Sequence, residues 1–437
     1  MPVDAPPQAL INHGRLLLLT QYSSRLPPRS PRFLWPPPRL LLHIQPFLAA
    51  DLLGLDDDGE ETGDATHRAE VAYQKSFLKE LIKRIEEAIQ RAIEDGAERD
   101  DWEVEDLLLS HYADLMAMPS TSSGAAVGGS DPMESLSAAL PYTNHSTPLE
   151  RHLSYYYPLR HPQEHGAHKD LISGWDQVHL YESSALVGAG TTALKTWEAS
   201  LRLASHVLCN KSEFTAPGAR VLELGSGTGL LSVVVAAVQR EAGKGGRLCA
   251  TDLPSIVRGK LKKTFEHNDV TTSTTADTDV QLLDLDWVEL EHEVKEGKSQ
   301  DDPSSASNGQ ASPTQALAAF APNLILGADI IFDPSIISPL VTTIKCALEA
   351  GAAKSRAPSP QALVASTVRN VSTYSRFLAL LDAAGLVSEE VELQRCVVEA
   401  PTYGQLPERT PPIVAFSSGH DEQREGTVKG LRIRLPS

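Results

Sequence analysis

The stretch Arg-Val-Leu-Glu-Leu-Gly-Ser-Gly-Thr-Gly-Leu-Leu, residues 220–231, decides the fold. An aliphatic run leads into three closely spaced glycines, and an apolar helical pattern follows, so the stretch predicts a strand, a tight turn and a helix. Gly225, Gly227 and Gly229 lack the Cβ atoms that would hold a ligand away from the backbone, and they tolerate turn angles that other residues resist. A ligand can therefore lie against bare peptide at the end of this strand.

The spacing and charge of this turn favour S-adenosyl-L-methionine over a dinucleotide. Dinucleotide folds use Gly-x-Gly-x-x-Gly and hold a pyrophosphate at the helix N-terminus. Here the spacing is Gly-x-Gly-x-Gly, and Glu223 would repel a pyrophosphate but suit a cationic methionine end. Asp252 follows the next strand, where a carboxylate can accept both ribose hydroxyls. The alternative is a plain βα turn with Asp252 as a helix cap before Pro254.

Outward from the turn, short aliphatic runs alternate with helical stretches, which predicts a mostly parallel sheet covered by helices. The expected strands are 219–224, 247–251, 279–284, 323–328, 361–367, 388–398 and 429–435. The expected helices are 228–240, 255–267, 335–350 and 371–384, and the polar insertions 295–315 and 417–427 are interpreted as surface loops. The pattern thus predicts an α/β domain, which follows the amphipathic helices near the N-terminus.

Three regions are expected along the chain. Residues 1–119 hold a proline-rich start and amphipathic helices within 77–93 and 102–118. Residues 120–149, rich in Ser, Gly and Ala, are interpreted as a linker, and residues 150–437 as the methyltransferase domain. Residues 5–50 are rich in Arg and lack acidic residues like a transit peptide, but their prolines argue against the amphipathic helix that such a peptide forms.

Composition limits the partners. The net charge of -18 over 437 residues argues against binding nucleic acid through phosphate neutralisation. It suits a basic patch on a protein substrate, although acidity that only maintains solubility is an equal alternative. No apolar run is long enough to cross a membrane, and neither the four cysteines nor the histidines before the core have zinc-ligand spacing. We expect a cytoplasmic monomer that binds no metal.

Six motifs carry a resemblance to a known family. They are Gly-Thr-Thr-Ala-Leu-Lys-Thr-Trp-Glu-Ala at 190–199, the glycine turn, Thr-Asp-Leu-Pro at 251–254, Leu-Asp-Trp at 285–287, Gly-Ala-Asp-Ile-Ile-Phe-Asp-Pro at 327–334 and Thr-Val-Arg-Asn at 367–370. In this order they resemble the seven-strand methyltransferases of family 16, which modify lysines in translation and chaperone proteins. The resemblance covers roughly residues 150–437 and, loosely, the N-terminal helices.

The resemblance implies the fold class α/β, a seven-stranded Rossmann-like, S-adenosylmethionine-dependent methyltransferase with an N-terminal helical extension. It implies a sheet ordered 3-2-1-4-5-7-6 with strand seven antiparallel. It implies that the methionine portion lies by Glu223 and the glycines, the ribose by Asp252 and the adenine by Trp287. The implied cofactor residues are Trp197, Glu223, Gly225, Ser226, Gly227, Gly229, Asp252, Asp286, Trp287 and Ala328. Two departures are Phe332, where the family's Asp-x-x-Tyr element has a hydroxyl, and Ala193, where relatives often have Gly.

Methyl transfer from a sulfonium is an in-line displacement, so the site must align a neutral amine. We expect Asp329 to hold the incoming ammonium and Phe332 to form an aromatic wall for the lysine stem; Asp329 as a cap of the helix near Pro334 is the alternative. Arg369 could shape the substrate opening, and Asn370 could equally be a helix cap.

The resulting hypothesis is a protein-lysine N-methyltransferase that acts on translation elongation factor 2. Three alternatives remain open at this point: methylation of another protein, methylation of a small molecule, or a non-catalytic binding module that retains the fold. Base methylation is disfavoured, because the fourth strand ends in Gly-Ala-Asp-Ile-Ile-Phe and not in an Asn-Pro-Pro-Tyr type motif.

Overall fold

A computed structural model describes most of the chain. The described residues are 6–56, 58–60, 62, 69–96, 102–118, 150–159, 171, 174–183, 195–243, 246–273, 280–297, 311–354, 359–402 and 409–436. The linker expected at 120–149, the glycine-threonine motif up to residue 194 with Ala193, and most of the insertion 295–315 lie outside these residues. The predicted boundaries between the three regions therefore stay predictions.

The central sheet has the strand order that the sequence implied. Its described strands, in spatial order, are β5 (Thr272–Ser273), β6 (Val280–Asp284), β4 (Arg247–Asp252), β3 (Arg220–Leu224), β7 (Leu324–Ala328), β8 (Gln361–Val368), β12 (Thr427–Arg434) and β9 (Val387–Val391). Strands β6 to β8 are parallel, and β12 runs antiparallel to both β8 and β9. Apart from the two-residue β5, this is the order 3-2-1-4-5-7-6 with an antiparallel strand seven, so the predicted fold class is confirmed.

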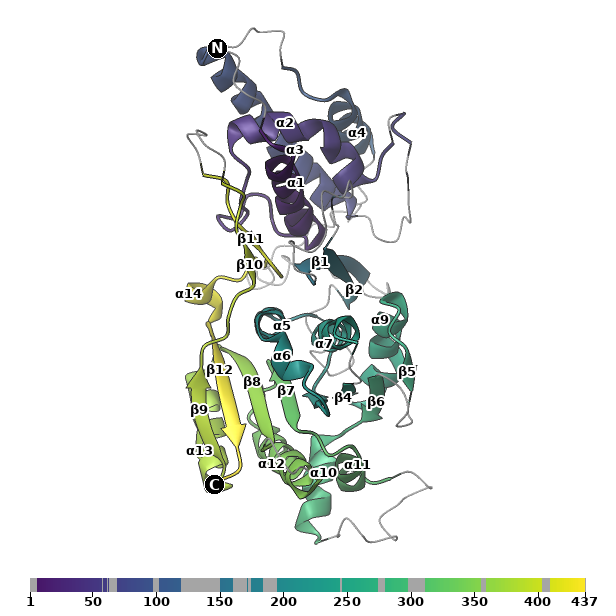
Figure 1. Ribbon diagram of the computed structural model, residues 1–437, viewed down its shortest axis with the longest axis vertical. Helices are drawn as coiled ribbons and strands as arrows, with labels where there is room; N and C mark the ends of the chain where they lie inside the picture. Colours follow the sequence, from purple (N-terminus) through teal and green to yellow (C-terminus); the bar gives the residue numbers. More distant parts are fainter. Residues whose placement is uncertain are drawn as a thin grey trace, which may run out of the picture.

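Helices cover both faces of this sheet, as Figure 1 shows. On one face lie α5 (Glu198–Cys209), α6 (Lys211–Phe214), α7 (Leu230–Glu241), α8 (Pro254–Ile256), the π-helical turn η4 (Val257–Leu261) and α9 (Lys262–His267). On the other lie α10 (Trp287–Lys295), α11 (Pro313–Phe320), α12 (Ile337–Lys354) and α13 (Val371–Ala383). Each face of the sheet has its own hydrophobic core, because successive side chains of a strand point to opposite faces. In β3, Val221 packs in the core under α5 and α7, and Leu222 packs in the core under α12 and α13.

Two predicted elements differ from the structure. The expected helix 255–267 is divided by the π-helical turn η4, and the expected strand 388–398 ends at Val391. Residues 397–398 instead pair with 413–414 as the small ladder β10 (Val397–Val398) and β11 (Ile413–Val414). The apolar pattern predicted the strand but not that residues 397–398 leave the central sheet to pair with 413–414. The new partner depends on a distant contact, because Ile413 packs among the N-terminal helices.

The N-terminal region is more helical than the sequence predicted. It contains α1 (Gln8–Ser23), α2 (Pro38–Leu48), the π-helical turn η1 (Ala49–Leu53), α3 (Val71–Glu94) and α4 (Asp106–Ala117). The expected helices 77–93 and 102–118 correspond to α3 and α4. The prolines do not prevent helices in the start: they lie before the helices or in their first turns, where no backbone N–H is needed, and only Pro46 lies inside one. We name these elements the helical unit.

A β-hairpin that the sequence did not predict joins the helical unit to the sheet domain. β1 (Glu150–Pro158) pairs antiparallel with β2 (Trp175–Ser183), and Figure 1 shows the pair between the two bodies. Its faces pack on different cores: Tyr155 and Tyr157 join the core of the sheet domain, whereas Tyr156 packs against the helical unit. The hairpin is therefore a structural link between both parts of the protein.

No helix in the described part of the chain is long and apolar enough to cross a membrane. Within the same residues, no group of three or more His, Cys, Asp or Glu side chains is placed to hold a metal ion.

Candidate functional site

The glycine turn forms one wall of a cavity at the carboxyl end of β3. Gly225 and Gly227 have φ values of +67° and +53°, in the left-handed region that favours glycine. A Cβ on Gly225 would lie 2.9 Å from Cγ2 of Ile330 and 3.6 Å from the ring of Trp287. Ile330 and Trp287 thus fill the space in which a side chain at position 225 would lie, and the backbone of the turn lines the cavity.

Gly229 was expected at the cofactor, but it does not line this cavity. It is the left-handed N-cap of α7, with a φ of +88°. A Cβ there would lie 2.8 Å from Cδ1 of Leu261, so glycine is required because the turn packs closely against η4. The third glycine of the motif therefore allows the turn to pack on η4, on the side away from the cavity.

Two carboxylates, the buried Glu223 and the half-buried Asp252, face the cavity from neighbouring strands. Glu223 of β3 is 2% exposed and accepts a hydrogen bond from the Ser232 hydroxyl. Burial raises the pKa of Glu223 to about 7, against weaker opposing effects of its serine hydrogen bonds. Asp252, at the end of β4, accepts the backbone N–H of Gly227 at 2.8 Å through Oδ2 and that of Leu253 at 2.7 Å through Oδ1. Burial also raises the pKa of Asp252.

Asp252 retains acceptor capacity after these two bonds. Each carboxylate oxygen can accept about two hydrogen bonds, and the structure gives Asp252 one on each. The backbone bonds fix the carboxylate beside the glycine turn, so its remaining lone pairs are available to hydroxyls of a ligand. This arrangement joins the two roles that the sequence left as alternatives, since Asp252 orders the turn and can still bind a sugar.

The segment after β6 contributes an aromatic wall. Asp286 is the N-cap of α10 and accepts the backbone N–H groups of Val288 and Glu289. Trp287, the next residue, lies against Gly225, and its indole N–H is buried without a hydrogen-bond partner among the described residues. A buried donor of this kind is costly unless a ligand or water satisfies it. Trp287 is therefore available to a polar ligand atom, whereas the Asp286 carboxylate is occupied in capping.

Asp329 does not present a free carboxylate to a substrate. Its Oδ1 accepts the backbone N–H of Thr367 at 2.6 Å, and its Oδ2 accepts the Thr367 hydroxyl at 2.9 Å and the Ala199 N–H at 3.5 Å. The Arg369 guanidinium lies 3.7 Å from Oδ2, and the Asp329 side chain is only 5% exposed. This geometry does not support the expected role of Asp329 in holding the ammonium. Neither does Asp329 cap the next helix, where Asp333 accepts the N–H and hydroxyl of Ser335.

The cavity, of about 380 Å³, collects nearly all the residues singled out in the sequence. Of these, it is lined by Trp197, Glu223, Gly225, Ser226, Gly227, Asp252, Asp286, Trp287, Ala328, Asp329 and Phe332. It is also lined by residues that the sequence reasoning missed: Lys195, Thr196, Ser200, Thr228, Leu253, Leu285, Val288, Ile330, Asp333 and Ile336. Thr196 and Thr228 could have been found, since each lies inside a motif quoted above: Thr196 in 190–199 and Thr228 in the glycine turn.

A larger cleft of about 770 Å³ adjoins the cavity and shares Lys195, Thr196 and Trp197 with it. Its walls come from the end of α1, the β1–β2 hairpin, the start of α5, the end of β8 and residues 417–426. Arg369 lines this cleft and lies over the Trp197 ring at 4.8 Å from the ring centroid. Its role at a substrate opening stays a prediction. Asn370 instead caps α13.

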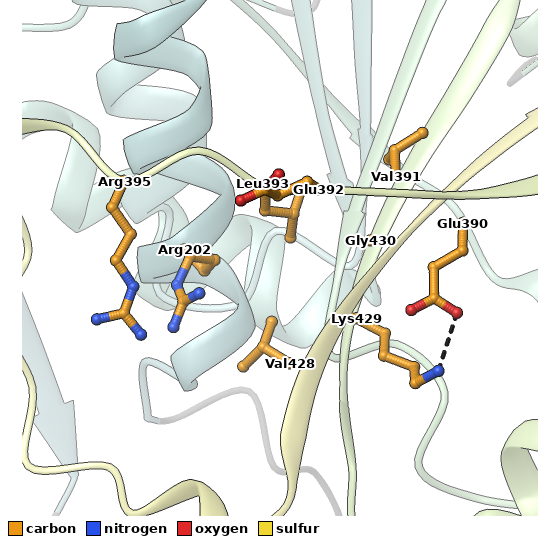
Figure 2. A pocket seen from close by; sticks show the side chains of 9 residues that line it. All are labelled: Arg202, Glu390, Val391, Glu392, Leu393, Arg395, Val428, Lys429 and Gly430. Carbon is orange, nitrogen blue, oxygen red and sulfur yellow. Dashed lines mark hydrogen bonds and ion pairs between the residues drawn. The ribbon is translucent and has the colours of Figure 1, made fainter.

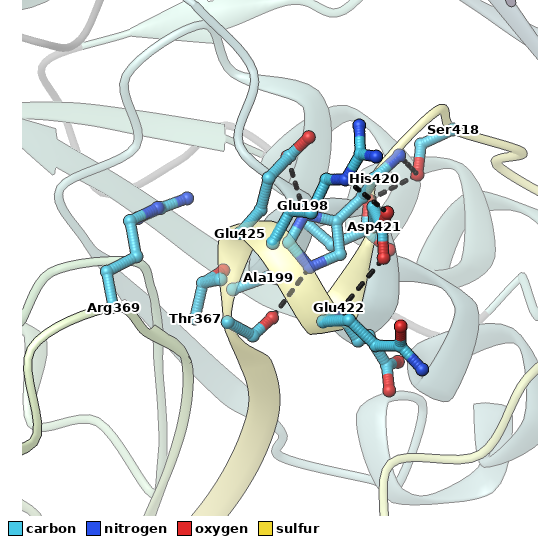
Figure 3. Close-up of polar contacts among 12 residues, drawn as sticks. Glu198, Ala199, Thr367, Arg369, Ser418, His420, Asp421, Glu422 and Glu425 are labelled. Carbon is cyan, nitrogen blue, oxygen red and sulfur yellow. Dashed lines mark hydrogen bonds and ion pairs between the residues drawn. The ribbon is translucent and has the colours of Figure 1, made fainter.

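The insertion 417–427 is not a free surface loop, contrary to the sequence interpretation. It contains α14 (Glu422–Glu425) and packs onto the start of α5, where the Ser418 hydroxyl donates to Glu198 (Figure 3). His420 is 7% exposed and its ring nitrogens face Glu425 at 3.0 Å and the Gly426 carbonyl at 2.8 Å. A polar sequence normally indicates a solvated loop, but here the polar groups bond to each other and to α5, so the segment forms part of the cleft wall.

A separate hollow lies at the far edge of the sheet, between α5, β9 and β12 (Figure 2). It is polar, and its Lys429 and Glu390 form an ion pair at 2.9 Å. None of the expected site residues lines it. The motifs therefore converge on the cavity at the glycine turn and on the cleft that adjoins it, and not on this hollow.

The sheet order, the glycine turn and the acidic residues at the ends of β3 and β4 define the class of fold, that of the seven-strand, Rossmann-like methyltransferases. Comparison with known proteins adds that residues 184–301 match the model of the lysine methyltransferase family. The matched segment, which is similar to that family, runs across the glycine turn, Asp252 and Trp287.

Three curated relatives that are similar to this chain are protein-lysine N-methyltransferases. The protein-lysine N-methyltransferase EEF2KMT of Homo sapiens is 28% identical over 218 residues, 49% of this chain and 58% of that protein. Its Bos taurus counterpart is 31% identical over 222 residues, 51% of this chain and 60% of that protein. The protein-lysine N-methyltransferase EFM3 of Chaetomium thermophilum is 29% identical over 296 residues, 65% of this chain and 68% of that protein. The chain thus spans about 60% of the length of the mammalian relatives.

Proposed function

We propose that this protein is an S-adenosyl-L-methionine-dependent protein-lysine N-methyltransferase, and that its substrate is translation elongation factor 2. The observation that carries the proposal is the single cavity that joins the bare glycine turn, the Glu223 and Asp252 carboxylates and the unpaired Trp287 N–H. The family match and the lysine methyltransferase relatives support the reaction class. We place the protein in the cytoplasm as a monomer.

The cavity fits the three chemical parts of the cofactor. Asp252 would accept the ribose hydroxyls with its free lone pairs. Glu223 would stabilise the cationic methionine end, where Gly225 and Gly227 let it lie against the backbone. Trp287 would border the adenine and offer its N–H. When bound, the cofactor supplies an electrophilic methyl group; the residues of the chain bind and orient it.

The substrate lysine would reach the cavity from the adjoining cleft, past Trp197. Trp197 lines both spaces, so its ring can contact the aliphatic part of a lysine as well as the cofactor. Phe332, which is 51% exposed, lies on the cavity wall and can flank the same stem without a hydroxyl. In this arrangement the amine loses its proton because desolvation beside a cation lowers its pKa. Asp329 has a structural role, since its hydrogen bonds connect α5 to β8 at the cavity wall.

The decisive test is methylation of purified elongation factor 2 with radiolabelled cofactor, followed by mass spectrometry of the labelled peptide. We expect one modified lysine in elongation factor 2 and one labelled band in a cytosolic extract. Label found only in small molecules or nucleic acid would refute the proposal. Label in a different protein would keep the reaction class and refute the substrate.

Removal of the ribose acceptor provides a test of the cofactor site. We expect Asp252→Ala to weaken S-adenosyl-L-methionine binding by about 1.5–3 kcal/mol, the usual worth of hydrogen bonds to a charged group. Calorimetry on the folded variant measures this loss, with Asp421→Ala, the N-cap of the short α14, as a variant that removes a capping carboxylate outside the cavity. Equal affinity of Asp252→Ala and the unmodified protein would contradict the placement of the sugar.

A further inference from the structure

A buried carboxylate of the hairpin reaches the site from outside the methyltransferase motifs. Glu182, near the end of β2, is 7% exposed and lines the cleft. Its Oε1 accepts the backbone N–H of Thr196 at 2.7 Å. Thr196 lies directly before Trp197, and both line the cavity as well as the cleft. One oxygen of the hairpin therefore fixes the backbone that presents Trp197.

The contact continues from Thr196 to the glycine turn. The hydroxyl oxygens of Thr196 and Thr228 lie 2.8 Å apart, and the two residues are 8% and 4% exposed. Thr228 stands between Gly227 and Gly229 in the turn itself. Glu182, Thr196 and Thr228 thus form a buried chain of contacts from the hairpin to the backbone against which the cofactor would lie.

The Glu182 carboxylate is an acceptor that the Thr196 backbone needs. Its Oε1 accepts the Thr196 N–H, and the Thr196 hydroxyl in turn shares a hydrogen bond with the Thr228 hydroxyl, in which either oxygen can donate. Burial raises the pKa of Glu182, and its contacts with Thr196 oppose this effect. An amide at position 182 would replace one carboxylate oxygen by an NH₂ group, which cannot accept the Thr196 N–H. The acceptor on Glu182 is therefore the group through which the hairpin contacts Thr196 and the turn.

Because the hairpin also packs on the helical unit, this chain links the two bodies of the protein. Tyr156 of β1 and Trp175 of β2 contact the core of the helical unit, while Val178 and Leu180 of β2 belong to the core of the sheet domain. A shift of the hairpin would move Glu182 relative to Thr196. The affinity of the cavity then depends on a segment that contributes no cofactor contact of its own.

We propose that Glu182 is a positioning residue for the cofactor site, which acts through Thr196 to hold the glycine turn in its binding geometry. The proposal rests on the proposed function, because the ligand of the cavity is taken to be S-adenosyl-L-methionine. It adds to that function a second layer of support, supplied by the hairpin and not by the sheet.

The test compares Glu182→Gln with a matched buried glutamate. Glu293 is 6% exposed and accepts the Thr314 N–H at 3.2 Å and the Thr314 hydroxyl at 2.8 Å, the same pair of contacts at a place that does not line the cavity. We expect Glu182→Gln to weaken binding of S-adenosyl-L-methionine and of S-adenosylhomocysteine about tenfold in calorimetry. The KM for the cofactor should rise by the same factor, with kcat at saturation nearly unchanged. Glu293→Gln should leave both affinities unchanged.

Equal affinities in Glu182→Gln and the unmodified protein would overturn the proposal and leave the proposed function intact. Failure of the unmodified protein to bind S-adenosyl-L-methionine would instead refute the proposed function. If Glu182→Gln does not fold, Thr196→Ser and Thr196→Val decide: the serine variant keeps the hydroxyl and should bind normally, whereas the valine variant should bind about tenfold more weakly. Equal binding by those two variants would also overturn the proposal.

Discussion

Two adjacent regions at the carboxyl ends of the parallel strands hold carboxylates in different ways. At the end of β3 and β4, Glu223 and Asp252 face the cavity, and Asp252 has one hydrogen bond on each oxygen. At the end of β7, Asp329 has three hydrogen bonds from Thr367 and Ala199, the Arg369 guanidinium lies 3.7 Å away, and the side chain is only 5% exposed. One region is arranged to receive a ligand, and the other joins β8 and α5.

The difference shows what strand-end position means. A parallel sheet brings every such residue to one edge, which is why all three acids are found at the site. Whether a carboxylate is free depends on donors from distant segments. The Asp329 partners Thr367 and Ala199 are 38 and 130 residues away in sequence. Position alone therefore predicts membership of the site but not the role within it.

The largest effect is expected from Gly225→Ala, which changes the region that is arranged to receive a ligand. In Gly225→Ala the new methyl group would meet Ile330 at 2.9 Å while the backbone holds a φ of +67°. Relief requires movement of the turn or of Ile330, and both line the cavity. We expect the affinity for S-adenosyl-L-methionine to fall on the order of 100-fold, about 3 kcal/mol, in calorimetry.

The control for this variant is Gly218→Ala, at the other end of β3. Gly218 has a φ of +78°, but a Cβ there has nothing within 4 Å. It should cost about 1–2 kcal/mol in stability from the left-handed backbone and leave cofactor affinity unchanged. An equal loss of affinity in both variants would mean that general destabilisation, and not the shape of the turn, causes the effect.

The second prediction separates the two regions directly. Asn tolerates the left-handed backbone of residue 329, where φ is +53°, so Asp329→Asn changes only the acceptor pattern. An amide NH₂ would then face the Thr367 donors. We expect a loss of stability of about 1–3 kcal/mol in denaturant unfolding, with cofactor affinity nearly unchanged.

Asp333→Asn serves as the comparison for stability, since Asp333 is exposed, accepts from the nearby Ser335 and should change stability little. If Asp329 bound the substrate ammonium, Asp329→Asn would instead raise the KM for elongation factor 2 without loss of stability. That result would restore the role expected from the sequence and remove the contrast between the two regions.

The fold was predictable because its signals are local. Aliphatic runs, three glycines and Asp252 identify strands β3 and β4 and the turn between them, and the sheet order followed from the family resemblance. Most of the cavity wall came with them, since neighbouring parallel strands end at one edge. Gly229 is the exception: its glycine is required by packing on Leu261, which sequence spacing cannot distinguish from ligand contact.

The cleft was not predictable, because its parts are far apart in sequence. The β1–β2 hairpin has alternating aromatic faces, but nothing local shows that Tyr155 and Tyr156 enter different cores. Segment 417–426 is polar because its groups bond to each other and to α5. Helix α1 was missed because prolines flank it in the sequence, although none lies inside it.

The smallest expected effect sharpens the comparison through pH. The ordinary pKa of a glutamate is 4.5, and burial raises that of Glu223 to about 7, so the empty protein gains stability at low pH and loses this gain as the pH rises from 4.5 through 7. A cationic ligand prefers the ionised carboxylate. Calorimetry should therefore show S-adenosyl-L-methionine binding more tightly at pH 8 than at pH 6, by up to about tenfold, because the ionised fraction rises by about that factor.

Glu223→Gln isolates this effect, since the ligand's own titration remains in the variant. We expect its cofactor affinity to be lower at pH 8 and less dependent on pH than that of the unmodified protein. Asp329→Asn should keep the normal pH dependence, because Asp329 is bonded to Thr367 and Ala199 and does not meet the ligand's charge. If Asp329→Asn removed the pH dependence and Glu223→Gln preserved it, the two strand ends would have exchanged roles, and the cationic end of the cofactor would lie over β7.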